Sequence, residues 1–175
     1  MEFYIAQGVS ILTALTAVIT MQLKKMEWIL IGQILANLLT AATYFLLDGS
    51  SGAGLCILAI GHTVVMYLFN RKGIRPHWAV GLGFIALYIA CSVYYFESMV
   101  DCLSAMGAIF FALSVMQEKP AASRFFYVFN PIFWMIYDIF THAYVSLLTH
   151  FIVFVSTFIA MIRIDHVFSK KKDQV

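Results

Sequence analysis

Residues 27–47 read EWILIGQILANLLTAATYFLL, and Glu27 at the first position is the only charged side chain in this run. The run matches the length of about 20 apolar residues that a helix needs to cross a membrane. Its two ends differ in charge, because Lys24 and Lys25 precede it and Asp48 follows it. Since cytoplasmic loops carry the excess of Lys and Arg, we expect this helix to begin at the cytoplasmic face and to end outside.

Six further apolar runs flank this one, and charged residues, glycines or prolines separate them. The separations around Glu97 to Asp101 and around Thr141 to Tyr144 are the weakest, and each is also compatible with a kink inside one longer segment. The pattern predicts an all-α membrane protein with seven transmembrane helices. The seven runs cover residues 3–22, 27–47, 53–70, 78–96, 99–116, 125–143 and 145–163.

The distribution of charge supports seven spans. All 11 basic residues fall in alternate connections or in the C-terminal segment. The other connections hold no Lys or Arg, and the residues in or near them are Asp48, Glu97 with Asp101, and Asp138 with His142. Merging two neighbouring runs would put basic residues on both sides of the membrane. The positive-inside rule therefore predicts an N-terminus outside and a C-terminus in the cytoplasm. The basic residues are Lys24, Lys25, Arg71, Lys72, Arg75, Lys119, Arg124, Arg163, Lys170, Lys171 and Lys172.

The composition excludes other classes of protein. Of the 175 residues, 62% are hydrophobic and 11% are charged, against about 45–50% and about a quarter in soluble domains. So few charges cannot cover a solvent-facing surface, and seven spans leave no room for a separate soluble domain. The net charge of +2 argues against a nucleic-acid partner. Because the sequence has no catalytic, nucleotide-binding or complete metal-ligand motif, we expect no enzymatic activity, no cofactor and no metal site.

Two parts of the chain resemble each other. The first and fifth runs end with the same pattern, M-Q-x-K, at residues 21–24 and 116–119, and Asn37 and Tyr44 recur 93 residues later in the sixth run. A duplication of this kind gives two parallel three-helix bundles related by an axis along the membrane normal. We therefore expect a 3+1+3 arrangement. Its parts are residues 1–70 as the first bundle, 78–96 as a linker helix, 97–165 as the second bundle, and 166–175 as a basic cytoplasmic tail.

Polar residues form a stripe in the second run and another in the sixth. Gln33, Asn37, Thr40 and Tyr44 are spaced by four, three and four residues, which places them on one helix face. If the two stripes meet between the bundles, they form a solute site in an apolar wall. The alternative is that these side chains hydrogen-bond to neighbouring helices. The predicted substrate-binding residues are Asn37, Tyr44, Asn130, Trp134, Tyr137 and Asp138.

A proline and several ionisable residues inside the apolar runs each allow a functional and a structural interpretation. Pro131 has no amide hydrogen, so the sixth helix should be kinked or broken near its cytoplasmic third, as a hinge or as a static kink. Asp138 is an ionisable group inside a span, and His142 lies one turn further on and could pair with it. His62 and His150 are candidates for proton coupling, and each can also be a hydrogen-bonded helix contact.

Several short motifs resemble the bacterial inner-membrane family called YgjV. They are Ile5-Ala6-Gln7-Gly8, Tyr44-Phe45-Leu46-Leu47-x-Gly49 with Gly52-Ala53, and Trp134-x-x-Tyr137-Asp138. The resemblance covers nearly the whole chain and implies a bacterial inner membrane. The expected topology is remotely similar to that of the SWEET and PnuC carriers. This sequence lacks the Pro-Gln pair of the PQ-loop group, and Asn130-Pro131 is the nearest trace of a W-N-W-P stretch.

Together these features predict a transporter that moves a small polar or aromatic metabolite by alternating access, as a facilitator or as an ion-coupled carrier. Two alternatives stay open: a ligand-binding or receptor-type protein on the same scaffold, and a structural membrane subunit. The expected partners are a small-molecule solute and the lipid bilayer, with no nucleic acid. A homo-oligomer is compatible with the sequence.

Overall fold

The protein is all-helical in the part of the chain that its structure describes. The structure is a computed structural model, which describes residues 2–46, 50–96, 98–140 and 144–165. These residues form eight α-helices and no strand. The helices are α1 (Glu2–Met21), α2 (Met26–Leu46), α3 (Ser50–Arg71), α4 (Trp78–Tyr94), α5 (Asp101–Val115), α6 (Pro120–Tyr127), α7 (Phe129–Phe140) and α8 (Tyr144–Arg163).

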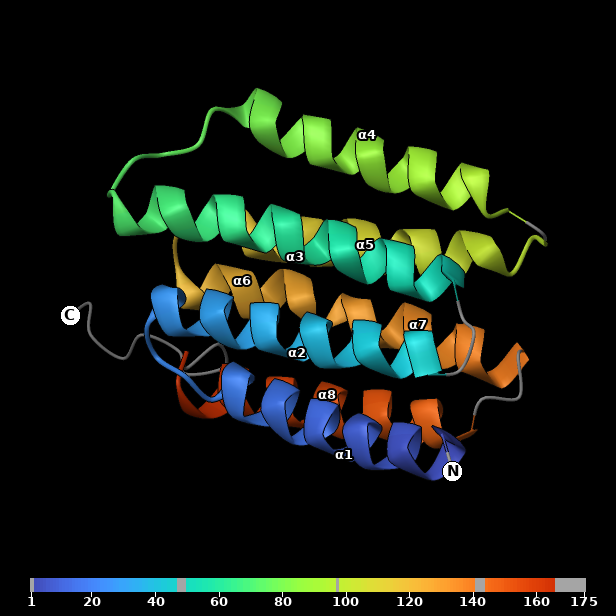
Figure 1. The fold of residues 1–175 in the computed structure, drawn as a ribbon. Coiled ribbons are helices and arrows are strands. Elements are labelled where there is room, and N and C mark those ends of the chain that lie inside the picture. Colours follow the sequence, from blue (N-terminus) through green and yellow to red (C-terminus); the bar gives the residue numbers. More distant parts are fainter. Residues whose placement is uncertain (1, 47–49, 97, 141–143, 166–175) are drawn as a thin grey trace.

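The helices run side by side along one direction (Figure 1). In the first part of the chain α2 packs between α1 and α3, and in the second part α7 packs between α5 and α8. The two parts meet where α1 packs against α8 and where α3 packs against α5. Helix α4 packs mainly against α5 and less against α3.

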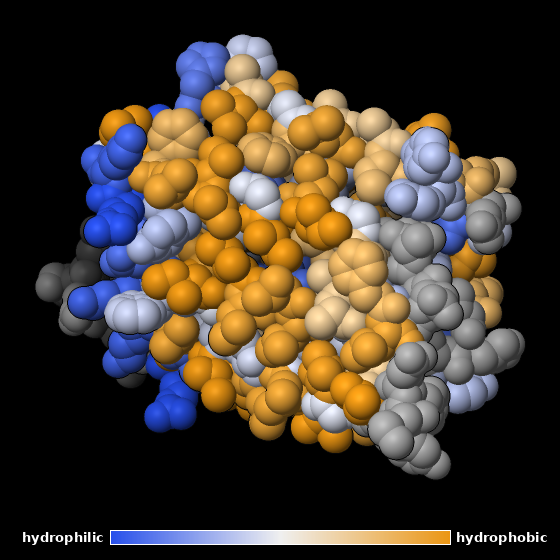
Figure 2. Space-filling model, viewed as in Figure 1, coloured by the Kyte–Doolittle hydropathy of each residue, from blue (hydrophilic) through white to orange (hydrophobic). Residues whose placement is uncertain are grey.

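The connections with basic residues gather at one end of this bundle. The α1–α2, α3–α4 and α5–α6 connections lie at the same end as the C-terminal end of α8 (Figure 1), and we call this the basic end. Hydrophilic residues are concentrated there, and hydrophobic residues cover the middle of the face shown in Figure 2. Helices α2 (Met26–Leu46), Ala53–Arg71 of α3 and Ser146–Arg163 of α8 are long and apolar enough to cross a membrane. Shorter apolar helices cover Gly8–Met21, Trp78–Tyr94 and Asp101–Val115.

The sixth apolar run is two helices, as Pro131 predicts. Helix α6 ends at Tyr127 and α7 begins at Phe129, four and two residues before Pro131. Because proline has no amide hydrogen and its ring crowds the carbonyl four residues earlier, the series of helical backbone hydrogen bonds is interrupted at the Tyr127 carbonyl. The helical segment begins earlier than the run at 125, because Pro120 stands at the first helical position, where its missing N–H costs nothing.

Two glycines allow helices to approach closely. A Cβ atom at Gly32 of α2 would lie 2.1 Å from Thr20 Oγ1 on α1. A Cβ atom at Gly107 of α5 would lie 2.8 Å from Trp134 Nε1 on α7. Small residues at helix contacts are typical of membrane bundles. In lipid the hydrophobic effect does not bring helices together, so they associate through close van der Waals packing. The second contact also holds Trp134 in place at the site described next.

Candidate functional site

A cavity of about 130 Å³ lies between the two parts of the chain. Residues of all eight helices line it. On α3 the cavity is lined by residues 55, 56 and 59, and on α8 by residues 149, 150 and 153. Both sets lie in the half of the helix that is farther from the basic end. The volume exceeds what one water molecule needs, so the cavity has room for a small solute.

The predicted stripe of α2 lines this cavity along its whole length. Gln33, Asn37, Thr40 and Tyr44 all border it. Two of them donate within their own helix: Asn37 Nδ2 donates to the Gln33 carbonyl and Thr40 Oγ1 donates to the Ala36 carbonyl, both at 2.8 Å. The Gln33 side chain differs, because its buried Nε2 has no hydrogen-bond partner among the described residues.

The matching stripe of α7 contributes Asn130 and Trp134 to the wall. Asn130 Nδ2 donates to the Gly107 carbonyl of α5 at 2.8 Å. This bond is a helix contact inside the second part of the chain, so Asn130 has the structural role that the sequence left open as well as its place at the cavity. Trp134 stacks on His150 of α8, with ring centroids 5.8 Å apart and an interplanar angle of 19°.

The remaining two predicted site residues lie outside the set of residues that form the cavity wall. Asp138 is buried, and its Oδ2 lies 2.7 Å from Nδ1 of His150. The Tyr137 ring packs edge-on against Trp134 at 5.6 Å. Of the six predicted residues, four border the cavity, and Asp138 and Tyr137 contact the wall residues His150 and Trp134. The predicted pairing of Asp138 with His142 falls on a residue outside the described ranges.

His62 is separate from this cavity. Its side chain is 0% exposed and stacks on Phe84 of α4 at 4.2 Å, and within the described ranges neither ring nitrogen has a hydrogen-bond partner. Of the two candidate histidines, only His150 borders the cavity.

Sequence reasoning missed part of the wall. Tyr88 of α4 and Tyr127 of α6 both border the cavity, although α4 was expected only to link the two bundles. A tyrosine in the middle of an apolar run is the signal that could have pointed to Tyr88, since a phenol inside a membrane helix needs a polar contact or a cavity.

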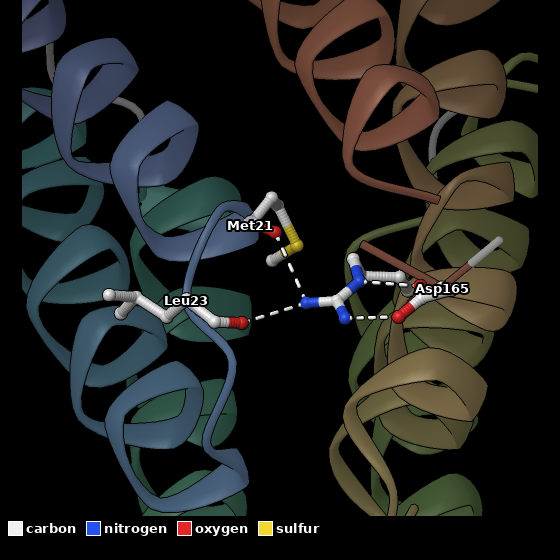
Figure 3. Close-up of polar contacts among 4 residues, drawn as sticks. Met21, Leu23 and Asp165 are labelled. Carbon is white, nitrogen blue, oxygen red and sulfur yellow. Dashed lines mark hydrogen bonds and ion pairs between the residues drawn. The ribbon is translucent and has the colours of Figure 1, made fainter. Parts of the chain in front are cut away.

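A buried ionic cluster lies at the basic end (Figure 3). The Arg124 side chain of α6 is 1% exposed, and it pairs with both carboxylate oxygens of Asp165, just after α8, with Nε to Oδ2 at 2.8 Å. One terminal nitrogen of the guanidinium also donates to the Leu23 carbonyl at 2.8 Å and to the Met21 carbonyl at 3.3 Å. From the sequence we interpreted Arg124 only as a charge in a connection, whereas this side chain joins α6, the residue after α8 and the α1–α2 turn.

A comparison with protein families identifies the chain. The family model Imp-YgjV, described as a bacterial inner membrane protein, matches residues 4–167. The chain belongs to the YgjV family. The match extends over α2 to α8 and nearly all of α1, so the cavity and the ionic cluster belong to a bacterial inner-membrane protein. The family predicted from the short motifs is confirmed. No curated protein and no solved structure matches the chain significantly, so a similarity to SWEET or PnuC carriers is not shown.

Proposed function

We propose that this YgjV-family protein is a carrier for a small polar or aromatic metabolite and works by alternating access. The observation that carries the proposal is the cavity between the two parts of the chain, with an apolar wall and convergent polar groups from α2 and α7. Sites of this composition are typical of small-molecule binding. The chemistry of the wall supports binding rather than catalysis, and we propose no enzymatic activity.

The helix contacts support the 3+1+3 arrangement. If α1, α2 and α3 are exchanged with α5, α6–α7 and α8, the contact of α1 with α8 becomes the contact of α5 with α3, and both contacts exist. The placement of α2 between α1 and α3 likewise becomes that of α7 between α5 and α8. Only α4 has no counterpart. We therefore propose two parallel bundles related by a pseudo-two-fold axis, with α4 as the linker.

Seven spans and their orientation are part of the same proposal. The spans would be α1 to α5, α6 with α7, and α8, and the basic end would face the cytoplasm according to the positive-inside rule. The break between α6 and α7 adjoins the wall residues Tyr127 and Asn130. Interrupted membrane helices are tolerated where they line a cavity, which supports a transport pathway at this place.

The Arg124 cluster suggests which end is closed. The bonds from Arg124 to the Met21 and Leu23 carbonyls join the two bundles at the basic end, whereas Arg124 and Asp165 belong to the same bundle. In the proposed cycle the bundles separate at this end by breaking the two carbonyl bonds, while the ion pair stays intact. His150, which borders the cavity and pairs with Asp138, is the residue we propose for proton coupling if the carrier is ion-coupled.

Counterflow into proteoliposomes tests this function. Vesicles loaded with one unlabelled nucleoside, sugar or B vitamin at a time should accumulate the labelled solute when the pure protein is present. The double variant Asn130→Ala, Trp134→Ala should lose this flux. The control variant Phe133→Ala removes a neighbouring ring of α7 that stacks on Phe110 outside the cavity, and it should keep the flux.

The outcomes separate the alternatives. Wild-type flux in the double variant contradicts the assignment of the site. A solute that raises the unfolding temperature of the protein but shows no counterflow indicates a binding or receptor-type protein on this scaffold instead of a carrier.

A further inference from the structure

Among the described residues, two buried side chains that border the cavity carry a polar atom without a hydrogen-bond partner. Gln33 is 2% exposed and Tyr88 is 1% exposed, and both border the cavity, from α2 and from α4. The Gln33 Nε2 atom and the Tyr88 hydroxyl lack partners. An unpaired buried donor costs free energy, so native proteins rarely keep one without a reason.

Several other polar groups at the wall are already engaged. Asn37 and Thr40 donate to carbonyls of their own helix, and Asn130 donates to Gly107. Within the described residues, the remaining unpartnered buried side-chain atoms belong to His62 and Ser92, which do not border the cavity. Gln33 and Tyr88 are therefore the two buried side chains of the described wall whose unpartnered polar atoms a ligand could satisfy.

The wall also limits the charge of the ligand. In the part of the chain that the structure describes, no Asp, Glu, Lys or Arg borders the cavity, and the imidazole at its wall, His150, is paired with the carboxylate of Asp138. A buried ionic ligand needs a partner of opposite charge, and the wall offers none that is unpaired. Aromatic rings of Tyr44, Phe111 and Trp134 line the cavity, and flat faces of this kind favour a planar molecule.

We infer that Gln33 and Tyr88 bind the ligand directly, and that the ligand is a small uncharged planar molecule with a carbonyl-type acceptor. The acceptor receives a hydrogen bond from Gln33 Nε2, because an amide nitrogen can only donate. The Tyr88 hydroxyl bonds a second polar atom of the ligand. This inference rests on the proposed function for its site, and it makes α4 part of that site as well as a linker.

A matched series of three aromatic probes tests the inference. Benzamide is uncharged, benzoate is an anion and benzylamine is a cation at pH 7, and all three have the same ring. Thermal unfolding of the pure protein in detergent is measured with increasing concentrations of each probe. Benzamide should raise the unfolding temperature in a saturable way, and benzoate and benzylamine should not.

Three variants assign the binding to these residues. Gln33→Leu and Tyr88→Phe should each weaken benzamide binding by about threefold to tenfold, as expected for one lost hydrogen bond. Without a probe, Gln33→Leu should unfold at the wild-type temperature or above it, because an unpaired donor is replaced by an apolar group. Ser92→Ala is the control, since this hydroxyl of α4 lies away from the cavity, and it should bind benzamide like the wild type.

The results distinguish this inference from the proposed function. Equal stabilisation by benzoate or benzylamine, no stabilisation by benzamide, or wild-type affinity in both Gln33→Leu and Tyr88→Phe overturns the inference. Counterflow of another solute by the wild-type protein would still support a carrier. Conversely, benzamide binding that depends on Gln33 supports the inference even if no solute shows counterflow, in which case the carrier function fails.

Discussion

Removal of either partner of the buried pair at the basic end should destabilise the protein strongly. Arg124 is 1% exposed and Asp165 is 5% exposed, so truncation of one leaves the charge of the other unpaired inside the protein. In Arg124→Met the Leu23 and Met21 carbonyls also lose their donor. Breaking a buried ion pair in this way costs about 3–5 kcal/mol. For a chain of this length the cost corresponds to a fall in unfolding temperature of about 6 to 20 °C.

A double-mutant cycle measures this coupling. Thermal unfolding of the wild type, Arg124→Met, Asp165→Leu and the double variant is recorded in the same detergent at one scan rate. The double variant should unfold at a higher temperature than either single variant, because no buried charge is left without a partner. Asp165→Asn should cost less than Arg124→Met, since the guanidinium keeps its two carbonyl acceptors.

An exposed ion pair at the same basic end of the protein provides the control. Arg75 and Glu118 are 2.9 Å apart but 85% and 49% exposed, and such pairs contribute about 0–1 kcal/mol. Arg75→Met should therefore change the unfolding temperature little. If Arg124→Met is as mild as Arg75→Met, or if the two single effects simply add in the double variant, the cluster does not join the helices as described.

Three further predictions concern the site and the topology. Gly107→Ala places a methyl group against the Trp134 indole, so it should shift tryptophan fluorescence and reduce counterflow at least tenfold; unchanged fluorescence would contradict the contact. Pro131→Ala restores an amide hydrogen for the Tyr127 carbonyl, and it should keep or raise the unfolding temperature while slowing counterflow if the break is a hinge. In a background without native cysteines, Arg75→Cys should react only with reagents that reach the cytoplasm and Ser98→Cys with impermeant reagents added outside. Labelling of both from the same side would refute the seven-span topology.

Features set by the local chain could be predicted from the sequence. The face formed by Gln33, Asn37, Thr40 and Tyr44 follows from the helical period, and all four residues border one cavity. The break before Pro131 follows from the chemistry of one residue. Both predictions depend only on positions a few residues apart, where the geometry of the helix leaves little choice.

Features set by packing between distant helices could not be predicted. Asp138 pairs with His150 on the next helix, a partner that spacing on one helix cannot reveal. Arg124 contacts Asp165, which is 41 positions away in the sequence, and the carbonyls of residues 21 and 23, which are 103 and 101 positions away. The place of Tyr88 at the cavity depends on how α4 packs against its neighbours. Each of these contacts needs the orientation of two helices, which hydropathy and charge do not specify.

The distribution of bonds around Arg124 bears on how the basic end could open. The guanidinium has one strong contact inside the second part of the chain, with Asp165, and two contacts with carbonyls of the first part. If the bundles part, only the carbonyl bonds are lost, and water can replace them as the end becomes hydrated. Two hydrogen bonds of a charged donor, at about 1.5–3 kcal/mol each, are comparable with the cost of about 3–5 kcal/mol for breaking the buried pair, but hydration of the carbonyls and of the guanidinium offsets their loss. The charge of Arg124 would therefore stay neutralised through the whole motion, which is what an end that opens and closes repeatedly requires.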